Sequence, residues 1–241
     1  MRDGQELHRL GVLAFGDSIT NAGGELQWGV ALQSWALWVA RALGLAYTGY
    51  AFDGALADDV LDKQIPRYTR YTAHPDARYD LGCLYVGVND VRALTWDPEG
   101  FEQRHREALE FLATRCERTL TLTPPLDLGW PRKRSKVTQL TDAVRRSAAT
   151  TGTLVTDLSD FGARNYIMAD QIHPTAFGQI AIAHRALETL AADGLAPSAL
   201  PSWMILYEKT WYGQLRGDLT YVYRRGKVTV KEAALSARMR L

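Results

Sequence analysis

The sequence places a serine where a nucleophile could be held. The apolar run at residues 12–15 is followed at once by Gly16-Asp17-Ser18-Ile19-Thr20, so an expected strand ends in a tight turn that carries Ser18. A serine hydroxyl attacks a carbonyl only when a base removes its proton during attack. Taken alone, such a turn is as often a helix cap as a catalytic turn. The chemistry therefore depends on what the rest of the chain brings to Ser18.

A histidine and an aspartate late in the chain could supply the base. His173 stands three residues after Asp170, in the segment Asp170-Gln171-Ile172-His173-Pro174. A histidine with its ordinary pKa of about 6.5 exchanges protons readily at neutral pH. Within one turn Asp170 can reach the other ring nitrogen, fix the tautomer and stabilise the imidazolium. The order Ser, Asp, His is compatible with acyl transfer through a covalent acyl-enzyme.

Alternating strand and helix patterns would bring these residues together. Strands are expected at residues 12–15, 47–52, 81–86, 119–123 and 153–158, and helices at 30–43, 57–65 (stopped by Pro66), 98–115, 137–150 and 174–192. This alternation predicts a three-layer α/β/α fold with a five-stranded parallel sheet in a flavodoxin-like order. Ser18, Gly54 and Asn89 each follow an expected strand, and ligands gather at the carboxyl ends of parallel strands. We therefore expect them to share one edge with His173.

In this order, the blocks around Ser18, Gly54, Asn89 and His173 resemble the SGNH, or GDSL-type, hydrolase superfamily over roughly residues 10–190. The resemblance implies a serine ester hydrolase that needs no cofactor and no metal. It implies an oxyanion hole made by the backbone N–H groups of Ser18 and Gly54 and the side-chain amide of Asn89. Asp17 and Asp90 are expected to hold the turns beside the catalytic residues.

Loops that follow the strands are expected to set specificity, and they are rich in tryptophan, arginine and amide side chains. The candidate substrate-binding residues are Trp28, Arg92, Trp96 and Asn165. These residue types suit a short acyl ester on a polar or carbohydrate alcohol better than a long alkyl chain. A lipid-type esterase, a thioesterase or lysophospholipase, and an O-acyltransferase using the same Ser/His pair remain alternatives. A non-catalytic binding module is the remaining class.

Composition restricts the class of protein further. The chain has 241 residues, of which 46% are hydrophobic and 23% charged, as in ordinary globular proteins. Its formal net charge of +1 provides no general attraction for nucleic acid or an anionic membrane. Cys83 and Cys116 lie in apolar segments and are expected to be buried free thiols. With no signal-peptide pattern and no long apolar stretch, we expect a cytoplasmic protein.

The last part of the chain differs from the rest. Residues 1–196 are expected to form the catalytic domain and residues 197–241 a C-terminal extension, because the strand–helix alternation ends there. From Trp203 onward there are eight Lys or Arg residues against three acidic ones. β-Prone residues on either side of Arg224-Arg225-Gly226 predict a β-hairpin over 219–230. The extension could be an ordinary charged surface, a docking site for an acidic partner, or a homo-oligomer contact.

Overall fold

Five parallel strands form the centre of the molecule. The computed structural model describes residues 9–72, 76–93, 95–129, 132–163, 165–207 and 210–238. The strands are β1 (Val12–Gly16), β2 (Tyr47–Gly49), β3 (Tyr79–Tyr85), β4 (Cys116–Leu122) and β5 (Leu154–Thr156). They lie side by side in the order β2-β1-β3-β4-β5, which confirms the flavodoxin-like sheet.

The central strands are apolar throughout because the sheet is covered on both faces. Every residue of β1 is buried, as are six of the seven residues of β3. Gly16 at the end of β1 pairs in register with Tyr85 at the end of β3. The turns that follow these two strands therefore leave the sheet side by side, at the same level.

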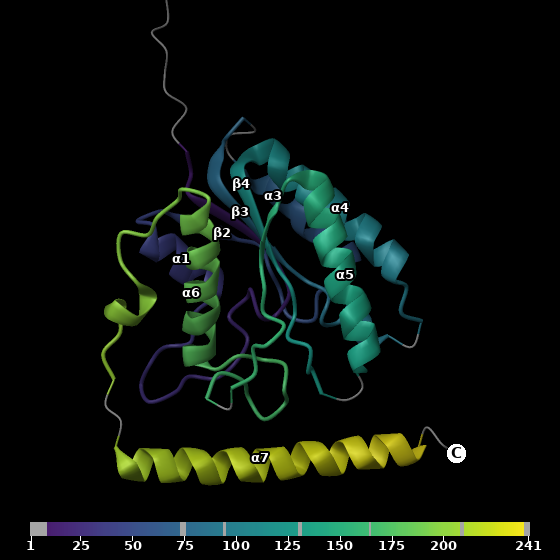
Figure 1. Ribbon diagram of the computed structural model, residues 1–241, viewed down its shortest axis with the longest axis vertical. Helices are drawn as coiled ribbons and strands as arrows, with labels where there is room; N and C mark the ends of the chain where they lie inside the picture. Colours follow the sequence, from purple (N-terminus) through teal and green to yellow (C-terminus); the bar gives the residue numbers. More distant parts are fainter. Residues whose placement is uncertain are drawn as a thin grey trace, which may run out of the picture.

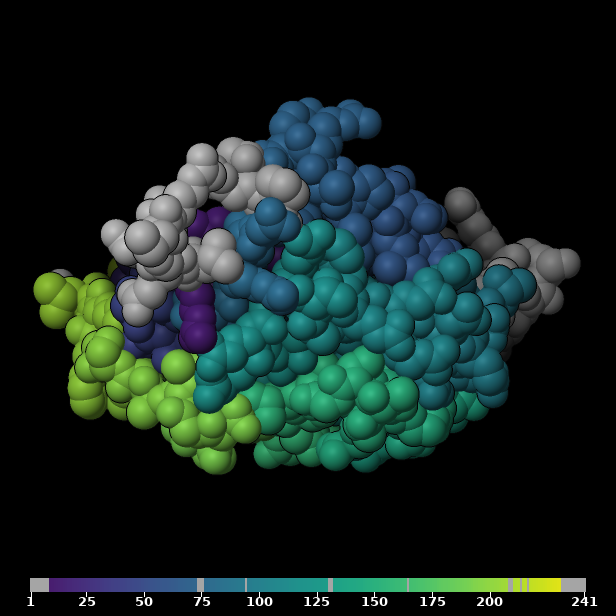
Figure 2. Space-filling model, turned by 90° about the horizontal axis from the view of Figure 1, so that it is seen from above, coloured from purple at the N-terminus to yellow at the C-terminus, as the bar shows by residue number. Residues whose placement is uncertain are grey.

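Helices pack on the two faces of the sheet (Figure 1). Helices α1 (Trp35–Ala42) and α6 (Ala176–Ala192) pack on one face, and α3 (Ile65–Tyr71), α4 (Pro98–Arg115) and α5 (Arg134–Thr151) cover the other. Side-chain caps fix where two of them begin, because Asp97 accepts from Gly100 N–H and Thr175 accepts from Gly178 N–H. Seen from the end opposite the catalytic edge, the teal helices α4 and α5 spread over much of the surface (Figure 2).

The prediction that Pro66 would end the helix beginning at residue 57 is wrong. A short helix α2 (Ala57–Asp59) continues into a π-helical turn (Val60–Gln64) and then into α3, with Pro66 in the first turn of α3. In the wider turn Ile65 N–H bonds to Val60 O, and the proline, which has no N–H to donate, falls at the start of the next helix. The helical segment therefore continues past Pro66, and the side chain of Gln64 is buried in the protein interior.

The predicted β-hairpin is also wrong, because the segment forms one helix, α7 (Trp211–Arg238). Leu215, Leu219, Val222 and Val230 recur at spacings of three, four and eight residues, which place them on one side of a helix. The same β-prone residues also fit an alternating pattern, and the predicted hairpin was based on that pattern. In Figure 1, α7 lies across the end of the molecule where the loops after the strands emerge. The predicted boundary at residue 197 stays a prediction.

The two cysteines are buried, as expected, and two histidines make structural hydrogen bonds. Cys83 and Cys116 are buried free thiols. His105 is buried between α4 and α5, where it bonds Ser147 Oγ and Thr121 Oγ1, and burial lowers its pKa to about 3. His184 accepts a hydrogen bond from Ser202 N–H, while His8 and His74 lie outside the described residues. Among the described helices, none combines the length and apolarity needed to cross a bilayer.

Candidate active site

The candidate catalytic residues meet where the strand order changes direction. From β1 the chain adds β2 on one side and then β3 on the other, so the turns after β1 and β3 border a crevice. Ser18 follows β1, Asn89 follows β3, and His173 lies in the loop just before α6. The sequence-predicted catalytic residues are thus brought together from three distant parts of the chain.

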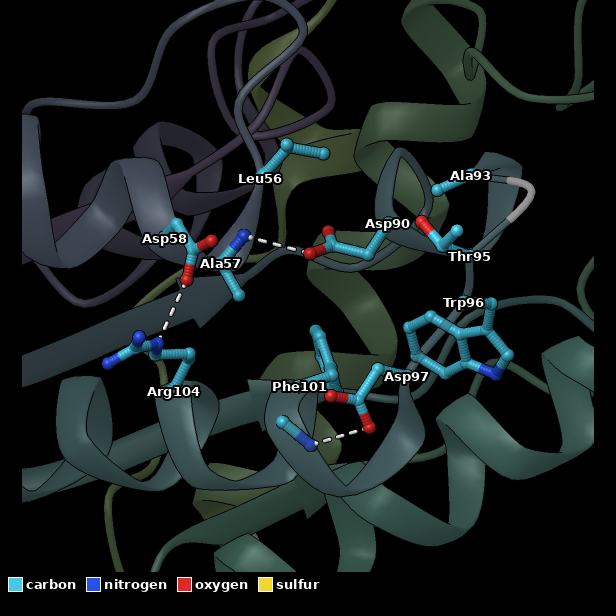
Figure 3. Close-up of a pocket in the computed structure, with 11 residues that line it drawn as sticks. Leu56, Ala57, Asp58, Asp90, Ala93, Thr95, Trp96, Asp97, Phe101 and Arg104 are labelled. Atoms are coloured by element: carbon cyan, nitrogen blue, oxygen red, sulfur yellow. Dashed lines mark hydrogen bonds and ion pairs between the residues drawn. The ribbon is translucent and has the colours of Figure 1, made fainter.

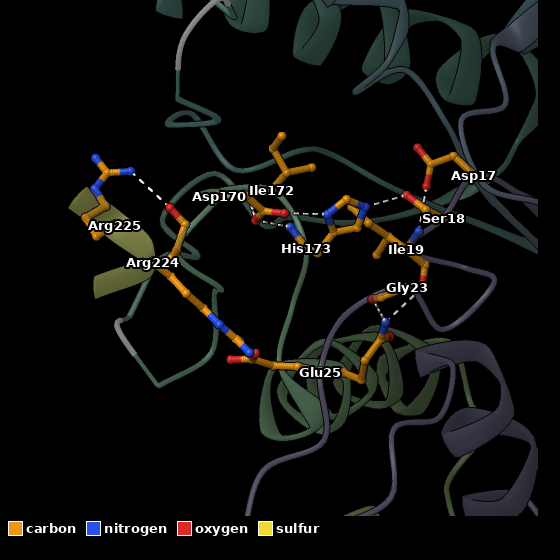
Figure 4. Close-up of polar contacts among 12 residues, drawn as sticks. Asp17, Ser18, Ile19, Gly23, Glu25, Asp170, Ile172, His173, Arg224 and Arg225 are labelled. Carbon is orange, nitrogen blue, oxygen red and sulfur yellow. Dashed lines mark hydrogen bonds and ion pairs between the residues drawn. The ribbon is translucent and has the colours of Figure 1, made fainter. Parts of the chain in front are cut away.

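Ser18, His173 and Asp170 form an unbroken hydrogen-bonded chain (Figure 4). Ser18 Oγ lies 2.8 Å from His173 Nε2, and His173 Nδ1 lies 2.7 Å from Asp170 Oδ2. The second carboxylate oxygen of Asp170 accepts the backbone N–H groups of Ile172 and His173, each at 3.0 Å. One carboxylate therefore orients both the imidazole ring and the loop that carries it.

The charges of this chain suit a base that gains a proton during reaction. The hydrogen bond that His173 donates to the Asp170 carboxylate raises the pKa of His173 above its ordinary value, although partial burial works against this. Burial would raise the pKa of Asp170, but its hydrogen bonds with His173 and Ile172 outweigh burial and lower it. Asp170 therefore stays ionised at neutral pH and favours the imidazolium that forms when Ser18 gives up its proton.

The turn that carries Ser18 is held by two buried glutamines. Gln64 bonds both backbone groups of Gly16, donating to its carbonyl at 2.7 Å and accepting from its N–H at 2.9 Å. Gln179 donates to Ile19 O at 2.9 Å and accepts from Trp35 N–H at 2.8 Å. Neither glutamine could be identified from the sequence, because a lone glutamine on a helix belongs to no motif.

Two aspartates hold neighbouring turns, as expected. Asp17 Oδ1 accepts Ile19 N–H at 2.9 Å, directly beside the nucleophile. Burial raises the pKa of Asp17 to about 7. Asp90 Oδ1 accepts Ala57 N–H at 3.1 Å, so Asp90 ties the turn after β3 to the segment that follows Gly54.

The three candidate oxyanion donors, Ser18, Gly54 and Asn89, lie in the turns that follow β1, β2 and β3, which are neighbours in the sheet. Asn89 Nδ2 donates to Ala55 O at 3.1 Å, which joins the Asn89 turn to the Gly54 turn. Gly54 has φ +78°, in the left-handed region that glycine adopts readily, and a Cβ there would touch nothing. Glycine at position 54 is therefore required by the backbone conformation of the turn and not by close packing. Within the described chain, the N–H groups of Ser18 and Gly54 donate to no other backbone or side-chain acceptor.

A buried arginine lies behind the site. Arg132, in the loop after β4, is 7% exposed and donates Nε–H to Val88 O at 2.6 Å. Its charge acts on the carboxylates of Asp170 and Asp17. Arg132 therefore supports the Asn89 turn and places a positive charge near two acids. The sequence shows it only as one of several basic residues in a loop.

The four candidate substrate-binding residues do not form one group. Trp96 borders a cavity of about 290 Å³, together with Asp58, Asp90 and Arg104 (Figure 3). Its indole N–H donates to Gln139 Oε1, and its ring packs against Phe101. Arg92 is exposed and does not line this cavity.

Trp28 and Asn165 border a second cavity, of about 390 Å³, between the α/β body and α7. Two polar contacts hold α7 there, as Figure 4 shows. Arg224 pairs with Glu25, and Arg225 Nη1 donates to Ala169 O at 3.2 Å, one residue before Asp170. The backbone of Trp28 is left-handed, with φ 48°, which is costly for a residue with a side chain.

Among the described residues, no three His, Cys, Asp or Glu side chains lie together in the way that a metal site requires. The arrangement of Ser18, His173 and Asp170 suits acyl transfer by a serine, with backbone and amide donors close by.

Three comparisons place the chain among known proteins. A comparison with curated protein sequences found no match. Residues 14–180 match the GDSL-like Lipase/Acylhydrolase family. The fold is similar to LAE5, described as an alpha/beta hydrolase enzyme from the metagenome of Lake Arreo, with TM-score 0.60 and 20% identity over 75% of this chain and 94% of that one.

Two further structures share the fold. Axe2, an acetylxylan esterase from Geobacillus stearothermophilus, aligns with TM-score 0.57 and 18% identity over 80% of this chain and 100% of its own. A lipase/acylhydrolase from Enterococcus faecalis aligns with TM-score 0.58 and 18% identity over 78% and 96% of the two chains. The family match covers more than half of the sequence and includes the Ser18, Asn89 and His173 blocks. The chain therefore belongs to the GDSL-like Lipase/Acylhydrolase family and is a serine carboxylic ester hydrolase.

Proposed function

We propose that this enzyme hydrolyses short-acyl, acetyl-like esters of a polar or carbohydrate alcohol, with Ser18 as nucleophile. The observation that carries the catalytic assignment is the hydrogen-bonded chain from Ser18 Oγ through His173 to Asp170. A serine, an imidazole and an ionised carboxylate in this order are the groups that acyl transfer needs.

The reaction has two steps. In the first, Ser18 Oγ attacks the ester carbonyl carbon while His173 Nε2 takes its proton, and the carbonyl oxygen becomes an oxyanion. The N–H groups of Ser18 and Gly54 and the amide of Asn89 donate to that oxyanion. His173 then gives its proton to the departing alcohol, which leaves an acyl group on Ser18.

In the second step, His173 takes a proton from a water molecule, whose oxygen attacks the acyl carbon. The new tetrahedral intermediate breaks its bond to Ser18 Oγ, which receives the proton from His173, and the free acid departs. Asp170 keeps Nε2 of the imidazole directed at Ser18 through both steps, because it holds the opposite ring nitrogen.

The side chains around the site favour a substrate whose alcohol part is polar. Neither of the two cavities described above offers the continuous wall of large apolar side chains that a long alkyl chain needs. The name of one structural neighbour, an acetylxylan esterase, is compatible with an acetyl group on a sugar.

Hydrolysis of p-nitrophenyl esters, from acetate to decanoate, tests the proposal with wild type beside Ser18→Ala. We expect the rate to fall as the chain lengthens, and Ser18→Ala to lose all but a small residue of activity, a drop of about 10⁴-fold or more. Ser147→Ala removes another buried serine, away from this edge, and should keep full turnover. Equal rates for wild type and Ser18→Ala would contradict the nucleophile assignment. Product analysis with an added sugar acceptor separates hydrolysis from acyl transfer.

A further inference from the structure

The cavity between α7 and the α/β body lies directly beside the loop that carries His173. Ile167, in its wall, forms a bridge with Pro174, the residue after His173. Glu25 and Thr175, also in the wall, form a bridge with each other; Thr175 is two residues after His173, and Glu25 is two residues after Gly23, whose N–H donates to Ser18 O. The wall of the cavity is therefore tied both to the segment that carries His173 and to the segment that follows Ser18.

The side chains around this cavity suit a ligand with many hydroxyl groups. Gln27 and Asn165 face it from the body, and Gln214 and Tyr221 face it from α7. Amides and hydroxyls donate and accept hydrogen bonds, as each sugar hydroxyl does. The side-chain oxygen of Gln27 is buried and accepts no hydrogen bond from any described residue, so a ligand hydroxyl would satisfy it.

The charged groups of this cavity favour a neutral ligand. Arg224, Glu25 and Asp218 line it, and Arg224 pairs with Glu25 across the gap between α7 and the body. This pairing leaves neither of the two paired charges to select an ionic ligand, and a carboxylate such as that of Asp218 accepts hydrogen bonds from hydroxyl groups. Its volume of about 390 Å³ lies in the range of small-molecule sites.

The orientation of α7 is the reverse of ordinary helix packing. A surface helix usually turns its apolar side to the core. Here Leu219, Tyr223 and Val230 face outward and are 63%, 64% and 70% exposed, whereas the half-buried Tyr221 lines the cavity. Burial of apolar side chains therefore does not explain why α7 lies across this edge. The described contacts that join α7 to the body are polar ones, made by Arg224 and Arg225.

We propose that α7 forms one wall of a subsite for the alcohol part of the ester, and that this subsite binds a neutral, polyhydroxylated group such as a sugar ring. The inference rests on the proposed esterase function. It adds a specificity element from outside residues 14–180, the part of the chain that matches the family.

The chain offers a matched pair of variants to test this subsite. Tyr221 and Tyr223 are tyrosines two positions apart on α7, one in the cavity wall and one on the outer side. The two substrates are p-nitrophenyl acetate and acetylated xylobiose, which share an acyl group and differ in the alcohol. For Tyr221→Ala we expect kcat/KM for acetylated xylobiose to fall about tenfold relative to that for p-nitrophenyl acetate, mainly through KM.

Tyr223→Ala should leave the ratio of the two kcat/KM values unchanged. Tyr221→Phe keeps the ring and removes only the hydroxyl, so it should lose part of the preference without altering the helix. An equal loss on both substrates for Tyr221→Ala, or the same change in ratio for both alanine variants, would overturn the subsite. Far-ultraviolet circular dichroism should show equal helix content in all variants.

A binding experiment separates this inference from the proposed function. Ser18→Ala is titrated with unesterified xylobiose in a calorimeter, beside the double variant that also carries Tyr221→Ala. We expect binding to weaken about tenfold in the double variant. No measurable binding, or equal binding by both proteins, would overturn the subsite even if the wild type hydrolyses both esters. If xylobiose binding depends on Tyr221 but the wild type hydrolyses neither ester, the proposed function would be overturned instead.

Discussion

The Ser18 turn and α7 border the same end of the sheet, but they are held there in different ways. The turn is fixed from several sides by buried groups, among them Gln64 and Gln179, and Ser18 itself is 6% exposed. The described contacts that hold α7 are polar and partly solvent-accessible, such as the pair between Arg224 and Glu25. In the proposed mechanism, bonds are made and broken at the first region, whereas the second would contact only the alcohol part of the ester.

This difference indicates how much motion the Ser18 turn and α7 can each tolerate. Acyl transfer requires the nucleophile and base to stay aligned within tenths of an ångström, which a buried hydrogen-bond network provides. A wall that contacts only the alcohol can shift without disturbing that alignment. Changes in the first region should therefore lower kcat or stability, and changes in α7 should act mainly on KM.

The largest effect is expected from Asp170→Asn. The variant keeps an oxygen for the N–H groups of Ile172 and His173 but loses the carboxylate that holds the His173 ring, so kcat/KM should fall by about 10⁴-fold. In the wild type we expect kcat/KM to rise with pH as His173 loses its proton, with a midpoint above the ordinary pKa of about 6.5, because the hydrogen bond to Asp170 raises that pKa. Without the carboxylate the midpoint should move down. A pH–rate profile with an unmoved midpoint would refute the pairing.

Asn89→Ala is expected to rank next. Loss of one oxyanion donor typically lowers kcat by about 10²–10³-fold. Asn165→Ala is the matched control, because this asparagine lines the cavity beside α7 instead. Steady-state kinetics on one polyol acetate should show a lower kcat for Asn89→Ala and a higher KM for Asn165→Ala. Similar changes in both variants would remove the distinction between the two regions.

Gln64→Leu should destabilise the fold. It leaves the N–H and the carbonyl of Gly16 without their shared partner, a cost of about 2–4 kcal/mol in the free energy of unfolding. Urea unfolding measures this cost, with Gln139→Leu as the control, because Gln139 bonds Trp96 in an exposed position. Equal stability of Gln64→Leu and wild type would show that the Ser18 turn is held by other contacts.

Arg224→Ala should have the smallest effect on global stability. An exposed ion pair contributes about 0–1 kcal/mol, so the unfolding midpoint of the sheet should barely move. Backbone amides of α7 should nevertheless exchange hydrogen faster, as mass spectrometry can follow. Lys227→Ala, whose cation lies over the outward-facing Tyr223 ring, is the control. Global destabilisation as large as that of Gln64→Leu would show that α7 is an integral part of the core.

Much of the α/β fold could be predicted because its signals are local. The apolar runs of β1 and β3 identify strands buried on both faces, and the helix at residues 98–115 has the predicted bounds in the structure. The grouping of Ser18, Asn89 and His173 followed from strand ends in a parallel sheet together with the family resemblance. That grouping is present in the structure, while the catalytic roles of these residues stay a proposal.

The remainder depends on contacts that no short pattern encodes. Gln64 and Gln179 hold the Ser18 turn across 48 and 160 residues of sequence. The π-helical turn before Pro66 and the helix α7 were both misread, because a proline and a run of β-prone residues are each compatible with more than one backbone. Trp28 and Trp96 were grouped by residue type, although the fold places them in separate cavities.

The two buried thiols can report how fast different parts of the sheet open, through the rates at which they are chemically labelled. Cys83 lies in the middle of β3 and is fully buried, whereas Cys116 begins β4 and is 7% exposed. A thiol reagent reaches a buried cysteine only when the surrounding structure opens. Fraying at the start of β4 would expose Cys116 first, while Cys83 would wait for separation of the central strands. Labelling of the unmodified protein can therefore time local and global opening separately.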